Sequence, residues 1–183
     1  MMTSGPSTRR PAVPGGGIPP LPPGAVLSAG GVRTYQGFAA LTVWQPWAWA
    51  IAAGLKRVEN RGWKPFSLRP GDFLGIHAAL RPVDVHHLAS VRENAVRAGR
   101  GLEVPTTFMH GALIAVATYA GVVTSRDELP VDQRCWWQGP VGWLLRDVRV
   151  LPRPLETRGQ QGIWPVAGEL VHQVWDQLGG RAA

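Results

Sequence analysis

Residue types that can build a polar pocket are concentrated between Trp44 and His77. Within this stretch Lys56, Glu59 and Arg61 follow one another closely, and tryptophans stand on both sides of them. A lysine can act as a base when desolvation lowers its pKa, or hold a phosphate when charged. A glutamate can accept a hydrogen bond from an exocyclic amine, and an arginine can donate two parallel hydrogen bonds to a phosphate or a base edge. These residues predict a polar pocket.

Four further residues are candidates for the walls of this pocket. Trp47 and Trp63 flank the charged residues and could stack on a base, which contributes about 1–3 kcal/mol per base. Trp47 also falls on the apolar stripe of a predicted helix, so a core position is its alternative. His77, at the end of a predicted strand, could hydrogen-bond a ligand or move a proton, or else bond to the backbone. Gln45 lies near the start of the same helix and completes the set.

A short strand over residues 57–61 is predicted to carry the charged side chains. Alternation puts Arg57, Glu59 and Arg61 on one face of this strand. If that face is exposed to solvent, the Glu59–Arg61 pair contributes only about 0–1 kcal/mol, whereas a buried face would line the pocket or close one end of the fold. The helix before the strand is predicted to begin at Pro46 and to end at Gly54.

The remaining elements complete one domain over residues 38–178. Pro152 and Pro154 are expected to stop the strand that begins at Val141. Short strands interrupted by two or three helices indicate an α+β fold around a small, partly open β-barrel with flanking helices. The predicted strands cover residues 38–43, 57–61, 72–78, 112–123, 141–151 and 162–166, and the predicted later helices cover residues 82–99 and 169–178.

Residues 1–37 differ in composition from the rest of the chain. They are rich in proline, glycine and serine and contain no acidic residue. Ordering such a segment costs about 1–2 kcal/mol per residue in backbone entropy, which its few apolar side chains do not offset. We therefore predict a disordered tail with polyproline II character, and a short second tail over residues 179–183.

The overall composition bears on partners and on the cellular setting. The net charge of +7 favours polyanionic partners such as nucleic acid. Cys135 is the single cysteine, so no internal disulfide forms and a reducing, cytoplasmic setting fits. No apolar run has the length of a membrane span, so no membrane partner is expected. No cysteine and histidine set has zinc spacing, and the adjacent His86 and His87 cannot face one site, so neither a metal nor another cofactor is expected.

Four short motifs occur in a characteristic order. They are Trp44-Gln45-Pro46-Trp47-Ala48, the G-x-K-x-x-E-x-R run from Gly54 to Arg61, Ile76-His77-Ala78, and a C-terminal pattern that includes Gly142-Trp143-Leu144 and the run from Arg158 to Trp164. In these motifs the sequence resembles the ASCH domain family of the PUA-like superfamily, from about residue 38 to residue 166. The resemblance implies a PUA-like β-barrel with a cleft beside the first helix that binds RNA or single nucleobases.

The resemblance also implies possible catalysis, because a few relatives act as enzymes. One is an amidohydrolase on an acylated cytidine that uses a lysine, a threonine and a glutamate, and another is a proposed ribonuclease. The lysine matches Lys56, but the threonine position holds Glu59, so the hydroxyl nucleophile is missing there.

The leading hypothesis is therefore a module that binds RNA or a modified nucleoside. A hydrolase of the same fold, with Lys56 and Glu59 as its acid and base, is the first alternative. A protein-interaction adaptor that uses the loop tryptophans Trp136 and Trp137 and the proline-rich tail is the second. The predicted ligand-binding residues are Gln45, Trp47, Lys56, Glu59, Arg61, Trp63 and His77.

Overall fold

The structure, a computed structural model, describes residues 34–99 and 103–179. Its strands are β1 (Thr34–Val43), β2 (Val58–Arg61), β3 (Phe73–Ala78), β4 (Ala112–Val123), β5 (Val141–Glu156) and β6 (Ile163–Ala167). Its helices are α1 (Trp47–Ala52), α2 (Val85–Arg97) and α3 (Gly168–Gln177), with the short 3-10 helices η1 (Arg126–Glu128) and η2 (Val131–Trp136). The predicted α+β class is confirmed.

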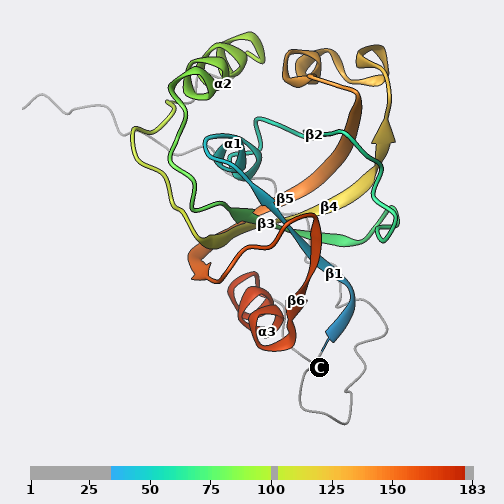
Figure 1. Cartoon of the computed structure of the whole chain (residues 1–183), viewed down its shortest axis with the longest axis vertical. Helices are drawn as coiled ribbons and strands as arrows, with labels where there is room; N and C mark the ends of the chain where they lie inside the picture. Colours follow the sequence, from blue (N-terminus) through green and yellow to red (C-terminus); the bar gives the residue numbers. More distant parts are fainter. Residues whose placement is uncertain (1–33, 100–102, 180–183) are drawn as a thin grey trace, which may run out of the picture.

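The strands form one six-stranded mixed sheet in the order β2-β5-β4-β3-β1-β6 (Figure 1). β1 and β3 are parallel, and all other neighbours are antiparallel. Within the described residues the outer strands β2 and β6 are not paired with each other, so the sheet is not closed into a barrel. The long strands β4 and β5 curve strongly, which places the short β2 beside α1.

Two strands differ from their predicted ranges by more than one residue at an end. β1 begins at Thr34, so residues 34–37 of the predicted tail belong to the sheet, while residues 1–33 and 180–183 lie outside the described part. β5 passes through Pro152 and Pro154 instead of stopping before them. The register between β4 and β5 shifts in this region, between the pairs Leu113–Leu155 and Ala115–Val150. Prolines are tolerated there because the ladder of hydrogen bonds is already interrupted at a bulge.

Helices α1 and α3 cover opposite faces of the sheet (Figure 1). Apolar residues on one face, including Leu41, Ile76 and Trp143, pack with Ile51 of α1. Residues on the other face pack with α3 around Trp175. Strands β1, β3, β4, β5 and β6 contribute to both layers because successive side chains point to opposite faces of a sheet.

A third apolar cluster joins α1 to α2 and η2. Trp136 belongs to this cluster and is 1% exposed, whereas Trp137 is half-buried and packs against it. The loop therefore lacks the exposed tryptophan pair on which the adaptor hypothesis depended. Among the described helices, none combines the length and the apolar composition needed to cross a membrane.

Candidate functional site

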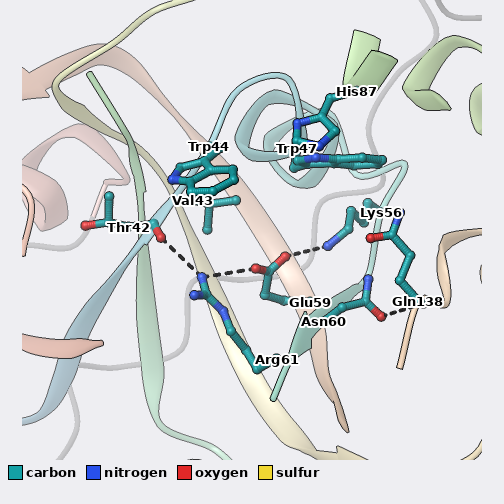
Figure 2. A pocket seen from close by; sticks show the side chains of 10 residues that line it. All are labelled: Thr42, Val43, Trp44, Trp47, Lys56, Glu59, Asn60, Arg61, His87 and Gln138. Atoms are coloured by element: carbon teal, nitrogen blue, oxygen red, sulfur yellow. Dashed lines mark hydrogen bonds and ion pairs between the residues drawn. The ribbon is translucent and has the colours of Figure 1, made fainter. Parts of the chain in front are cut away.

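A pocket of about 280 Å³ opens where the end of β1, the start of α1, β2 and the first turn of α2 meet (Figure 2). This volume is close to the lower end of the range of about 300–1,000 Å³ that is typical of small-molecule sites. The lining residues are Thr42, Val43, Trp44, Trp47, Lys56, Glu59, Asn60, Arg61, His87 and Gln138.

The floor of the pocket is a chain of charged groups. Nζ of Lys56 lies 2.5 Å from Oε2 of Glu59, and Nη2 of Arg61 lies 3.1 Å from Oε1 of the same carboxylate. The same Nη2 also donates to the backbone carbonyl of Thr42 at 3.1 Å. Lys56 is 2% exposed and Glu59 is 5% exposed. Buried charges are tolerated when they are paired and hydrogen-bonded, and this chain meets that condition.

Lys56 has a perturbed acid–base equilibrium. Burial lowers the pKa of its ammonium group, and the nearby Arg61 guanidinium acts in the same direction, while Glu59 opposes both. A lysine of this kind is an acid–base candidate as well as a donor. On Arg61, Nε is buried and finds no hydrogen-bond partner among the described residues.

The turn after α1 explains why Lys56 reaches the pocket. Gly54 adopts a φ of +71°, a left-handed conformation that glycine tolerates best. The N–H groups of Leu55 and Lys56 then both donate to the carbonyl of Ala50. This tight turn ends the helix and starts β2 beneath it, with Lys56 at the junction.

The opposite wall is aromatic. The rings of Trp44 and Trp47 lie above the Glu59 carboxylate (Figure 2). His87 joins them from α2, with its ring centroid 6.2 Å from that of Trp44 at an interplanar angle of 24° and 5.6 Å from that of Trp47. Trp44 is 47% exposed, so one part of its ring is accessible to a ligand. The pocket thus offers charged groups on one side and aromatic surfaces on the other.

Asn60 and Gln138 form the remaining wall. Nδ2 of Asn60 donates to the carbonyl of Trp136 at 2.9 Å, and its Oδ1 accepts from the backbone N–H of Gln138 at 2.9 Å. These bonds fix the backbone of Gln138 and leave its carboxamide at the mouth of the pocket (Figure 2). A carboxamide both donates and accepts, as the edges of nucleobases do.

Four of the seven predicted binding residues line the pocket, namely Trp47, Lys56, Glu59 and Arg61. Gln45 does not line the pocket, because both ends of its carboxamide form hydrogen bonds with the backbone. Its Oε1 accepts from the N–H of Trp49 at 2.9 Å, and its Nε2 donates to the carbonyl of Met109 at 2.8 Å.

Trp63 also lies outside the pocket. It packs edge-on against Trp143, with ring centroids 4.8 Å apart, and its carbonyl accepts from the Trp143 indole N–H at 3.0 Å. Arg57 points away as well, because its guanidinium pairs with Asp132 of η2 at 2.6 Å. The predicted three-residue face of the strand therefore contributes only Glu59 and Arg61 to the pocket.

His77 is the third predicted residue that does not line the pocket. It is 1% exposed and lies under the segment before β6, with Nε2 3.0 Å from the carbonyl of Thr157. Burial lowers the pKa of its imidazole. The ring of Trp164 packs edge-on against it, and Gly159 covers it so closely that a Cβ there would lie 2.6 Å from Nδ1. His77 therefore holds this segment on the sheet.

Sequence patterns did not identify six of the ten lining residues, namely Thr42, Val43, Trp44, Asn60, His87 and Gln138. His87 and Gln138 arrive from segments far from the charged strand, and no local spacing connects them to it. Trp44 belongs to the first motif and could have been chosen for that reason. Within the described residues, no group of three or more histidine, cysteine or acidic residues is arranged to hold a metal ion.

Comparison with known proteins shows which family this chain is similar to. A family model described as the ASCH domain matches residues 41–133, which include the whole charged floor. The crystal structure of ASCH from Zymomonas mobilis is 17% identical, covers 77% of this chain and 95% of its own, and gives a TM-score of 0.47. A mutant of the same protein is 18% identical, with coverages of 76% and 97% and a TM-score of 0.47. The comparison with curated proteins gave no match.

Proposed function

The chain belongs to the ASCH domain family, and from this premise we propose that its pocket binds an unpaired nucleobase, either in RNA or in a free modified nucleoside. The observation that carries the proposal is the position of the Lys56-Glu59-Arg61 floor opposite the rings of Trp44 and Trp47. A flat heterocycle with polar edges matches a space of this shape and chemistry, because its face can stack while its edge forms hydrogen bonds.

The requirement for an unpaired base follows from the depth of the polar groups. Lys56 and Glu59 are almost completely buried, so a base reaches them only by entering the pocket. In a duplex the edges are paired and the faces are stacked, and extracting a base costs a few kcal/mol. Single-stranded or looped RNA avoids this cost. The net charge of +7 supports attraction to such a polyanion.

Hydrolysis by the same pocket is the second candidate. Lys56 is buried, has a lowered pKa and contacts Glu59, so the two residues could act as an acid–base pair in hydrolysis. A covalent route has less support, because Thr42 is the one lining residue with a hydroxyl group. Its Oγ1 donates to the carbonyl of Gln160 at 2.8 Å and accepts from the indole N–H of Trp164 at 3.2 Å. Both hydrogen bonds hold this hydroxyl in the folded structure, so it is a poor candidate for a nucleophile.

The test is equilibrium binding of labelled single-stranded RNA, the matching duplex and a panel of nucleosides. Wild type is compared with Glu59→Gln, which keeps the shape of the side chain but removes its charge. Asp132→Asn is the matched control, since Asp132 forms an ion pair with Arg57 outside the pocket. We expect preference for the single strand and a loss of about tenfold in Glu59→Gln alone, the size of one charged hydrogen bond.

Equal affinity for the single strand and the duplex, or equal behaviour of the two variants, would contradict the proposal. Incubation of the same protein with acylated cytidines and a short RNA separates binding from hydrolysis. Turnover that Glu59→Gln abolishes would favour the enzyme, whereas intact binding without turnover would reject it.

A further inference from the structure

An arginine outside the pocket lies against one of its walls. The guanidinium carbon of Arg81 is 3.9 Å from the ring centroid of Trp44, which lines the pocket. Arg81 is exposed and precedes α2, the helix that supplies His87. Stacking of this kind holds a guanidinium in place through its face and leaves the N–H groups around its edge free to donate.

The cations on the floor of the pocket differ from Arg81 because they are already engaged. Lys56 and Arg61 both contact the Glu59 carboxylate, and Arg61 also donates to a backbone carbonyl. In the described part of the chain, Arg81 has no acidic partner within ion-pair distance. The N–H groups at the start of α2 are engaged as well, because Asp84 accepts from those of His86 and His87. Arg81 is therefore an exposed cation beside the pocket that has no acidic partner among the described residues.

We infer that Arg81, held on Trp44, binds a phosphate attached to the nucleoside whose base occupies the pocket. The inference rests on the proposed function and specifies its ligand class: a nucleotide, or a nucleotide unit of RNA, instead of a free base or nucleoside. The fork of an arginine matches two phosphate oxygens, and its fixed position reduces the entropy lost on binding. His87, whose ring also stacks on Trp44, adds a second nitrogen-bearing side chain at this rim.

The test compares a nucleoside, its monophosphate and a short single-stranded RNA that contains it, each titrated into the full-length protein. We expect the monophosphate and the RNA to bind about tenfold more tightly than the nucleoside at low salt, with a gain that shrinks as salt rises. Arg81→Gln is expected to abolish this gain and to leave nucleoside binding unchanged. Arg81→Lys keeps the charge but not the fork, so it should retain only part of the gain.

Arg92→Gln serves as the matched control, since Arg92 is an exposed arginine of α2, the helix that follows Arg81, and its substitution also removes one positive charge. A monophosphate that binds no better than its nucleoside, or equal effects of Arg81→Gln and Arg92→Gln, would overturn the inference. If the inference fails in either way but Glu59→Gln still weakens nucleoside binding, the proposed function stands. Failure of all three ligands to bind would reject the proposed function itself, and the inference with it.

Discussion

The ammonium group of Lys56 lies 2.5 Å from the carboxylate of Glu59, and both side chains are almost completely buried. Charges in this position have lost their contact with water, and they persist because each has a partner. Arg61 completes the group by contacting the second oxygen of Glu59. The three residues form a fixed polar surface that faces the rings of Trp44 and Trp47, and this relationship underlies the proposed binding of a base.

Substitution of Lys56 by methionine should lower the free energy of unfolding by about 3 kcal/mol, because it leaves Glu59 buried with one partner removed. The double substitution Lys56→Met and Glu59→Leu should recover part of this loss, since no buried carboxylate remains. Urea denaturation of the three proteins gives the values. If the Lys56→Met protein were as stable as wild type, the buried ion pair seen in the structure would be contradicted.

Gly159→Ala should destabilise the protein by about 1–3 kcal/mol, as overpacking commonly does. An added Cβ would lie 2.6 Å from Nδ1 of His77 and 2.8 Å from Oγ1 of Thr42, and it would also meet Cε1 of the same imidazole. Gly62→Ala is the control, because nothing lies within 4 Å of a Cβ at Gly62. Thermal melts of both variants measure the difference, and equal melting temperatures would refute the close packing at Gly159.

His77 should make stability depend on pH. Burial lowers the pKa of its imidazole in the folded state, so the unfolded chain binds a proton more readily. The contribution of His77 to the free energy of unfolding is fully present above the pKa of the unfolded chain, about 6.5. This contribution is lost as pH falls below that value, by up to about 1.4 kcal/mol per pH unit. His77→Gln should lose this part of the dependence. Denaturation at about pH 7.5 and about pH 5.5 gives the comparison, and parallel pH profiles of the two proteins would contradict it.

Trp44→Ala should weaken RNA binding by about tenfold, because stacking on one base contributes about 1–3 kcal/mol. Part of the loss with phosphorylated ligands would come from Arg81, which is positioned by the same ring. Phe66→Ala is the control, since Phe66 is 94% exposed and does not line the pocket. Fluorescence anisotropy with labelled RNA measures both variants, and an equal loss in the two would argue against a specific role for Trp44.

Local sequence signals predicted most of the fold. The α+β class and the order of helices and strands followed from periodicity and from glycine and proline positions. These signals failed where pairing with a distant strand determines the extent of an element. The example is β5, which continues through Pro152 and Pro154 because a bulge interrupts its ladder of hydrogen bonds with β4. Closure of the sheet also depends on long-range pairing of strands, and periodicity in the sequence does not report on it.

The candidate site was predictable in part for a similar reason. Lys56, Glu59 and Arg61 are close in sequence, and one turn and one strand bring them together. Gln45 has the right neighbours, but its carboxamide bonds to Trp49 and Met109. Residues such as Gln138 enter the pocket only after a distant segment packs against α1 and β2, so no local pattern identified them.

The most direct test of base binding is an NMR titration of the labelled protein with a short single-stranded RNA. A base held in the pocket should shift the indole resonances of Trp44 and Trp47, together with the backbone amides of Glu59 and Arg61. The shifts should saturate at one ligand per protein. Saturable RNA binding that leaves these resonances unmoved and shifts residues elsewhere, such as the arginines of β5, would contradict the account.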